Sequence, residues 1–350
     1  MNQKKREISF FFPFNFEDGM VQIGCQSGIG YANTEGELVI PCIYNYAYPF
    51  SEGLAYVEKD KRKSFISKSG DKVIHIDYDS ADPFREGLAG VMDAEGKWGF
   101  INKSGELVIP CTYLEITGFS EGLCGVYTAE GAGFIDKSGA MVVLPKYDDV
   151  QIFSDGIAIV SKDEKSFFID QSGNEILTLP VYNNQEISNF QDGLYTYMIN
   201  DKYGAIDRAG NEIIPFIYED ISGFSDGLAY ASLDGKYGFL NKEGNIAIPF
   251  TYDSLFDFTE GLAAAKSGGK WGFIDKNNNI VIPFQYTVAN PFSNGLAFVR
   301  AGGRKGYYID KKNEVRFTMT REYTIVEKIK IGFFALVVLG LIGLLISKLF

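Results

Sequence analysis

A repeat of about 34 residues runs through most of this chain of 350 residues. A Phe-x-acid-Gly-Leu pattern, or a close variant of it, occurs nine times, and successive turn glycines are 34 to 37 residues apart. These turn glycines are Gly19, Gly53, Gly87, Gly122, Gly156, Gly193, Gly227, Gly261 and Gly295. A unit this short cannot bury a core alone, so each unit must share its core with its neighbours.

Each copy carries two further landmarks in a fixed order. The first is clearest at 97–105, which reads Lys-Trp-Gly-Phe-Ile-Asn-Lys-Ser-Gly, and it returns at 236–244 and 270–276. The second is an Ile-Pro-x-x-Tyr segment, as in 109–113. The Trp-Gly pair itself survives only at 98–99 and 271–272, and several copies keep the glycine alone.

With these three landmarks in register, residues 14–318 resemble the WG-repeat family, which is named after the Trp-Gly pair. The resemblance implies an all-β repeat architecture. It implies no catalytic role, because the motif residues are structural in kind. The copies that lose the pair, at 63–64, 166–167 and 306–307, depart furthest from the family pattern.

Residues 84–117 illustrate the strands that we expect in one unit. Residues 88–92 form a first strand, and 97–102 alternate large and small side chains as a second strand does. The loop 103–105 ends in glycine and turns the chain into a return strand, 106–109, which Pro110 stops. The prediction is a three-stranded β-meander without helical periodicity.

The nine meanders could form an open row or a closed ring. Propellers usually have about four to eight blades, and nine exceeds that range. Residues 1–13 precede the first unit as an N-terminal cap, and 315–318 end the last unit without an Ile-Pro-x-x-Tyr segment. We therefore expect an open superhelix or solenoid, with a β-propeller as the alternative.

The charge of the chain is uneven. The formal net charge is −12, but the first seven residues and residues 321–350 each carry +2, which leaves −16 on residues 8–320. A body this acidic repels phosphate backbones, so we expect no nucleic-acid partner.

Histidine and cysteine are scarce. His75 is the single histidine, and it takes the place of the proline in its Ile-Pro-x-x-Tyr segment, which marks it as a repeat variant rather than a catalytic base. The four cysteines lie far apart without a Cys-x-x-Cys pair, which argues against a zinc site or a disulfide framework and fits a reducing compartment. We expect Cys42 and Cys111 to be small apolar fillers.

A charge-free apolar segment, 331–347, lies near the carboxyl end. Seventeen helical residues span about 25 Å, close to the lower limit for a membrane helix, and Lys330 and Lys348 flank the segment. We predict a single transmembrane helix here, preceded by a juxtamembrane linker, 319–330, and followed by a short tail, 348–350.

The basic residues around this segment predict its orientation. Three of them precede it and one follows it, so the repeats are expected in the cytoplasm, tied to the membrane by a C-terminal anchor. The amino end has no cleavage site typical of a signal peptide.

The acidic residues before the turn glycines are the strongest functional candidates. They are Asp18, Glu52, Glu86, Glu121, Asp155, Asp192, Asp226 and Glu260, with Asn294 in the ninth copy. A row of carboxylates could bind calcium or a basic partner. The favoured interpretation is turn chemistry, because one carboxylate in each repeat cannot supply the several oxygens of a calcium site.

No catalytic, cofactor-binding or metal-binding residue is assigned, and no cofactor is expected. The composition and the repeats favour a non-catalytic, membrane-tethered scaffold that binds a protein partner through its repeats and the lipid bilayer through 331–347. Two alternatives stay open: a hydrolase that uses carboxylates, and a carbohydrate-binding surface protein with exposed aromatic side chains.

Overall fold

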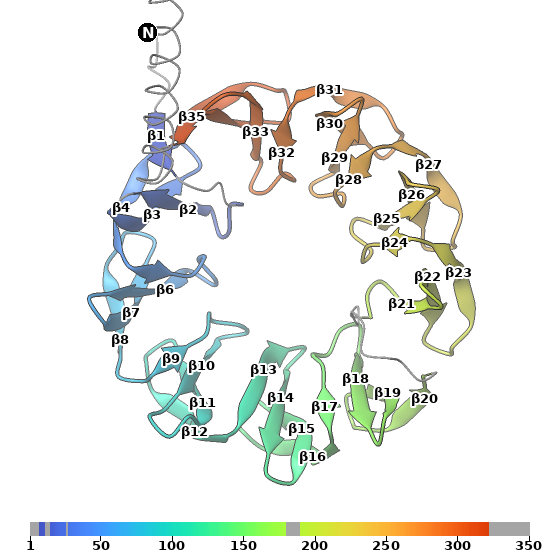
Figure 1. Cartoon of the computed structure of the whole chain (residues 1–350). Coiled ribbons are helices and arrows are strands. Elements are labelled where there is room, and N and C mark those ends of the chain that lie inside the picture. Colours follow the sequence, from blue (N-terminus) through green and yellow to red (C-terminus); the bar gives the residue numbers. More distant parts are fainter. Residues whose placement is uncertain (1–6, 11–14, 26, 180–189, 322–350) are drawn as a thin grey trace, which may run out of the picture.

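The computed structural model describes residues 7–10, 15–25, 27–179 and 190–321. Over these ranges the chain forms nine β-sheets that surround a central opening, so the fold is a closed β-propeller with nine blades (Figure 1). The all-β repeat architecture is confirmed. The open superhelix was the wrong choice between the two arrangements, because the first and last blades meet.

The strands of the first four blades run in chain order from the central opening outwards. They are β2 (Met20–Cys25), β3 (Gly28–Asn33) and β4 (Leu38–Tyr44); β5 (Tyr46–Ala47), β6 (Leu54–Lys59), β7 (Arg62–Ser67) and β8 (Lys72–Ile76); β9 (Ser80–Ala81), β10 (Leu88–Met92), β11 (Trp98–Asn102) and β12 (Leu107–Tyr113); and β13 (Glu115–Ser120), β14 (Leu123–Thr128), β15 (Gly131–Asp136) and β16 (Met141–Tyr147).

The remaining five blades repeat this order. Their strands are β17 (Asp149–Val150), β18 (Ile157–Lys162), β19 (Lys165–Asp170) and β20 (Glu175–Thr178); β21 (Leu194–Ile199), β22 (Lys202–Asp207) and β23 (Glu212–Tyr218); β24 (Asp220–Ile221), β25 (Leu228–Leu233), β26 (Lys236–Asn241) and β27 (Ile246–Tyr252); β28 (Ser254–Leu255), β29 (Leu262–Ser267), β30 (Lys270–Asp275) and β31 (Ile280–Tyr286); and β32 (Val288–Ala289), β33 (Ala297–Gly302), β34 (Lys305–Ile309) and β35 (Val315–Arg321), with β1 (Glu7–Phe10) added to the last sheet.

Most blades have one strand more than the predicted meander. The extra strand lies nearest the centre and, apart from β13, has only two residues, as in β28, where Leu255 pairs with Ala265 of β29. Two residues are too few to show a periodic pattern, which is why this strand could not be recognised in the sequence.

The outermost strand of a blade continues through its proline. Pro110 lies inside β12, and the register of the ladder shifts at this point, because Trp98 pairs with Tyr113 while Phe100 pairs with Ile109. The prediction that Pro110 ends the strand was wrong. Proline is tolerated here because no strand of the described chain lies on the outer side of β12, so no ladder needs the missing N–H.

The amino-terminal strand helps to close the ring. β1 pairs in parallel with β35, the outermost strand of the last blade, from Glu7 opposite Thr318 to Phe10 opposite Arg321. Side chains of the first blade, among them Phe16, pack in one core with Phe317 and Met319 of the last blade. Residues 7–10 of the predicted N-terminal cap therefore lie beside the last strand of the last unit.

Aromatic pairs connect neighbouring blades. In each pair, the Phe of the Phe-x-acid-Gly turn packs against the aromatic residue that follows the Trp-Gly position of the preceding blade, as Phe153 does on Phe134 with ring centroids 4.7 Å apart. Phe16 packs on Tyr308 in the same way, at 5.2 Å, across the junction of the last and first blades. The ring is therefore closed by the kind of contact that joins most of its other blades.

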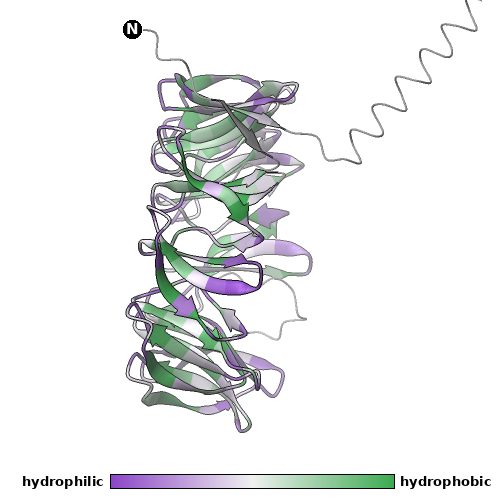
Figure 2. Cartoon of the chain, turned by 90° about the vertical axis from the view of Figure 1, so that its left-hand side faces the viewer, coloured by the Kyte–Doolittle hydropathy of each residue, from purple (hydrophilic) through white to green (hydrophobic). Residues whose placement is uncertain are grey.

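The ring is narrow when seen from its rim. Figure 2 shows the strands as bands of hydrophobic and mixed residues, with hydrophilic residues in the loops at both edges. Over the described ranges no helix has the length and apolar character to cross a bilayer. The predicted transmembrane segment, 331–347, lies outside these ranges.

Two of the four cysteines form a disulfide, contrary to the prediction. Cys25 at the end of β2 is bonded to Cys42 in β4, and their Cα atoms are 6.0 Å apart. The sequence separation of 17 hides this proximity, which arises where the register of β4 shifts between its pairs with Tyr31 and Ile29 and the backbone of Cys42 lies close to Gly30 of β3. Cys111 and Cys124 are free, and Cys124 is buried.

Candidate functional site

The nine acidic or amide residues before the turn glycines adopt a left-handed backbone. Glu52, for example, has φ of 52° and Gly53 has φ of 88°. Ser51 and Leu54, which flank them, exchange two backbone hydrogen bonds. These are the features of a two-residue hairpin with a type I′ turn, for which Asp-Gly and Asn-Gly are the preferred sequences.

The carboxylates of these turns do not point freely into water. Glu52 accepts a hydrogen bond of 3.0 Å from the backbone N–H of Gly87, the turn glycine of the next blade. Lys103, from the hairpin loop of that next blade, forms an ion pair with the same carboxylate at 3.0 Å. Each such acid therefore connects its own blade to the next one; we call this arrangement the clasp.

The clasp recurs around the ring. Turn glycines of the next blade bind Asp18, Glu52, Glu86, Glu121, Asp155, Asp226 and Glu260, and lysines of the next blade pair with Asp18, Glu52, Glu86, Asp192, Asp226 and Glu260. The acids were predicted to be turn residues. They are turn residues, but their carboxylates have a structural role between blades that one unit of sequence cannot reveal.

Burial raises the pKa of the Asp18 and Glu52 carboxyls, but hydrogen bonds from lysine and from the turn glycine outweigh it, so each pKa is below its ordinary value. For Glu86 the hydrogen bond from Lys137 is the largest influence, and the pKa is again lowered. The clasp therefore holds these carboxylates in the charged form.

The junction of the last and first blades uses neutral groups instead. Asn294 stands in place of the acid, and its side-chain amide donates to the backbone carbonyl of Phe16. Thr34 occupies the loop position at which most other blades carry lysine. Because neutral residues replace both the turn acid and the loop lysine, the clasp position at this junction contains no unpaired charge.

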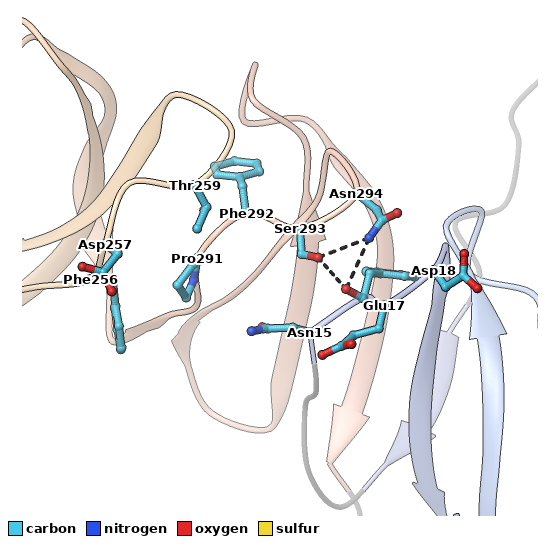
Figure 3. Close-up of a pocket in the computed structure, with 11 residues that line it drawn as sticks. Asn15, Glu17, Asp18, Phe256, Asp257, Thr259, Pro291, Phe292, Ser293 and Asn294 are labelled. Atoms are coloured by element: carbon cyan, nitrogen blue, oxygen red, sulfur yellow. Dashed lines mark hydrogen bonds between the residues drawn. The ribbon is translucent and has the colours of Figure 1, made fainter. Parts of the chain in front are cut away.

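A pocket lies at this junction. It has a volume of about 480 Å³ and is formed by turns of three consecutive blades, the eighth, the ninth and the first (Figure 3). Its walls include Asn15, Glu17, Asp257, Thr259 and Asn294. The size is in the range of small-molecule and side-chain binding pockets.

The rim of the ring carries exposed aliphatic side chains. They occupy the first two positions of the outermost strands; we call them the rim belt, which comprises Leu38, Val39, Val73, Leu107, Val108, Met141, Val142, Ile176, Ile246, Ile280 and Val281. Ile246 is 59% exposed and Ile280 is 57% exposed. Of the first three positions of β27, only the third, Ile248, is buried in the core.

The comparison with known families agrees with this geometry. The profile of the family described as "WG containing repeat" matches residues 29–62, 64–98, 98–128, 133–165, 167–203, 203–237, 237–271 and 271–304. The chain belongs to the WG containing repeat family. A matched segment such as 237–271 begins in one blade and ends in the next, so the repeat in the sequence is offset from the blade in space.

Other comparisons show little beyond the WG repeats. None of the curated proteins matches the chain. Among solved structures, BamB from Moraxella catarrhalis is similar at 11% identity, over 77% of this chain and 94% of that one, with a TM-score of 0.42. Hsv2 from Kluyvelomyces marxianus is similar at 10% identity, over 55% of this chain and 70% of that one, with a TM-score of 0.36. Such low scores support no inference about function.

The remaining sequence candidates lie apart from the pocket. His75 lies on the exposed outer strand β8, with its Nε2 2.9 Å from an oxygen of Asp77. His75 follows Ile74 as Pro110 follows Ile109, but it pairs with Ser64, whereas the ladder of the other blade shifts its register at Pro110. Within the described ranges, no group of three or more His, Cys, Asp or Glu side chains is placed to hold a metal ion.

Sequence reasoning missed the pocket. It is lined by residues of the first and last units, and their proximity depends on ring closure. One sequence signal pointed to this place: Asn294 is the amide among the acidic residues that precede the turn glycines, and it lies at the junction.

Proposed function

We propose that this WG-repeat propeller is a non-catalytic scaffold that binds a protein partner through the rim belt. The observation that carries the proposal is the recurrence of exposed aliphatic side chains at equivalent positions of separate blades. Monomeric soluble proteins seldom expose large apolar patches, and such patches mark interaction sites.

The outer strands favour binding through side chains over binding by strand addition. A peptide that adds to a sheet edge needs consecutive backbone groups to pair with. Pro110 and its counterparts at 41, 145, 215, 249 and 283 remove an N–H from the middle of the exposed edges. The partner should therefore contact the belt with an apolar surface of its own.

A double substitution, Ile246→Thr with Ile280→Thr, tests this proposal. Threonine keeps the β-branched shape that suits a strand but removes apolar surface from two adjacent blades. The matched control is Ile217→Thr, because Ile217 is 47% exposed on outer strand β23 and the equivalent residues of other blades include Thr112 and Thr251.

The measurement is affinity purification from detergent extracts with quantitative mass spectrometry. We expect the same partner protein to be recovered with the wild type and with the control. With the double variant, the amount recovered should fall at least about fivefold. Equal recovery with all three proteins, or no specific recovery with any, would contradict the proposal. Deleting whole units is a poor test, because it also breaks the ring.

We further propose that 331–347 anchors the ring to a membrane and that the ring faces the cytoplasm. The charge around the segment supports this placement. The Cys25–Cys42 disulfide favours an oxidising compartment instead. Rapid alkylation in intact cells tests the placement: both thiols should be alkylated if the ring is cytoplasmic. A disulfide that persists, together with protease cleavage of the repeats from outside, would contradict it.

A further inference from the structure

The hairpins that join the second and third long strands of the blades differ in charge around the ring. In the eighth, ninth, first and second blades, the hairpins 267–270, 302–305, 25–28 and 59–62 have formal charges of +1, +2, 0 and +2. These charges come from Lys270; from Arg304 and Lys305; and from Lys59, Lys61 and Arg62 against Asp60. In the third to seventh blades, the hairpins 92–98, 128–131, 162–165, 199–202 and 233–236 have charges of −1, −1, 0, 0 and 0. Net positive charge is therefore confined to four blades that follow one another across the ring junction (Figure 1); we call their four hairpins the basic sector.

The cations of the basic sector are available at the surface. All six of them are exposed, and Asp60 is the one acidic residue in the four hairpins. In the seventh blade, by contrast, the hairpin residue Lys236 is paired with Asp253 at 2.8 Å. Among the described residues, Lys61 and Arg62 have no acidic partner within ion-pair distance. These side chains can therefore bind an external anion without giving up an internal one.

The segments that lead into the second and ninth blades are less acidic than their equivalents. The residue after the tyrosine of the Ile-Pro-x-x-Tyr segment is acidic at 79, 148, 219 and 253, but it is Asn45 before the second blade and Thr287 before the ninth. Asp148 accepts a hydrogen bond of 2.8 Å from the N–H of Asp163, and Asn45 accepts the equivalent bond from Asp60 at the same distance. Asn45 thus holds the hairpin as an acid would, without placing a negative charge beside it.

One hairpin of the basic sector borders a pocket. The pocket has a volume of about 390 Å³ and is lined by Lys59, Asp60, Arg62 and Lys72, so three cations face one carboxylate. Ammonium and guanidinium groups form strong, charge-assisted hydrogen bonds to phosphate oxygens. The second blade can therefore hold a phosphate group in this pocket.

The described chain ends on the face that carries these hairpins. The second long strand of each blade runs from the clasp to its hairpin, so all hairpins lie on the face opposite to the clasp. In the last blade, β35 runs back towards this face, and Thr320 pairs with Lys305 of the hairpin. Only nine residues, 322–330, separate β35 from the apolar segment 331–347, and nine residues reach about 30 Å at most.

We propose that the basic sector docks on the anionic lipid headgroups of the membrane that 331–347 enters. This inference rests on the proposed membrane anchor, because the short connection holds this face close to the bilayer. Each lysine or arginine near an anionic lipid surface strengthens attachment about fivefold. The hairpins of the third to seventh blades bring no net positive charge, so docking tilts the ring towards the bilayer at the basic sector. The rim belt of those five blades stays accessible to a protein partner.

Acylation of lysine side chains, measured residue by residue with mass spectrometry, tests this docking. The full chain is inserted from detergent into preformed vesicles of phosphatidylcholine, either alone or with about a third of phosphatidylserine. We expect Lys59, Lys61 and Lys305 to react at least about fivefold more slowly in the anionic vesicles at low salt, and high salt should remove the difference. Lys162 and Lys202, in hairpins of the fifth and sixth blades, should react equally in both. Equal rates for the basic sector, or equal slowing of Lys162 and Lys202, would overturn the proposal.

A charge reversal locates the contact. Lys59→Glu with Lys61→Glu should fold, because Glu164 already occupies the turn position equivalent to Lys61, with φ of 62° against 65°. The control is Lys162→Glu with Lys165→Glu, which changes the charge equally in the equivalent hairpin of the fifth blade. We expect the slowing at the remaining lysines of the basic sector to fall below about twofold in the first variant and to persist in the control. Full slowing in the first variant, or an equal loss in the control, would contradict the assignment.

Flotation of the same samples separates this proposal from the anchor. A chain that floats with phosphatidylcholine vesicles at high salt has the anchor, and equal acylation rates in that chain would then refute the docking alone. A chain that floats only with anionic vesicles, with the basic sector slowed, would contradict the anchor and support the docking. Soluble glycerophosphoserine should not slow the acylation. If it did so as strongly as the vesicles do, the site would bind single anions, and docking on a lipid surface would be refuted.

Discussion

The glycine of the Trp-Gly position is required by the backbone of the neighbouring strand. A Cβ atom added to Gly99 would lie 2.5 Å from the carbonyl oxygen of Ile109 and 2.7 Å from the amide nitrogen of Cys111. The outer strand passes this closely where its register shifts at the proline. The irregular ladder beside Pro110 is therefore the reason why this position requires glycine.

Replacing Gly99 with alanine should destabilise the propeller by about 1–3 kcal/mol, because backbone atoms cannot move aside as a side chain can. The control is Gly223→Ala, whose Cβ would meet only the end of the flexible Gln191 side chain. Urea unfolding followed by fluorescence measures both changes. A Gly99→Ala protein as stable as the control would show that the outer strand can shift.

At the scale of the strand and blade, the aromatic pairs decide how blades join. Phe153 is 1% exposed and fills the space between the fourth and fifth blades against Phe134. At the equivalent place, the sixth blade has Ala205, which offers no ring to Phe224. We infer that the aromatic pair strengthens a junction but is not indispensable at every one.

Phe153→Ala should lower the free energy of unfolding by about 3–5 kcal/mol, since a large side chain is removed from a closed core. Leu144→Ala serves as the control, because Leu144 is 70% exposed on β16 and its truncation should change stability by less than about 0.5 kcal/mol. Chemical denaturation of the two variants gives both values. A similar loss of unfolding free energy in both variants would mean that the junction does not depend on the Phe153 side chain.

The sequence was sufficient to predict the strands that bear strong local signals. The turns at Asp-Gly and Glu-Gly, and the strands on either side of the Trp-Gly position, follow from residues next to one another. The two-residue strands, the path through Pro110 and the Cys25–Cys42 bond do not, because each depends on pairing between segments. The pocket at Asp257 was beyond reach for the same reason.

At the scale of the whole molecule, the recurrence of the clasp makes stability depend on pH. The pKa values of Asp18, Glu52 and Glu86 are lowered in the folded chain. A carboxyl with a lowered folded-state pKa contributes its full stability above the unfolded-state value, near pH 4, and loses it as the pH falls through the folded-state value.

We therefore expect the urea midpoint to be nearly constant from pH 7 to about pH 5 and to fall steadily below about pH 4. The double variant Glu52→Gln with Glu86→Gln should be less stable at pH 7 and should lose less on acidification. Unfolding curves at pH 7, 5, 4 and 3 provide the measurement. Parallel pH profiles for the two proteins would exclude a contribution from these two carboxylates.

Because the ring is closed, the fold does not require any particular blade to come first in the chain. Because β1 lies against β35 and Phe16 contacts Tyr308, the first and last blades are joined much as any other two blades are. A circular permutant, in which a linker runs back along the parallel pair of β1 and β35 to join Arg321 to Glu7 and new termini are placed between two other blades, should therefore adopt the same ring. A different blade would then be synthesised first, while each blade would keep the same neighbours in space.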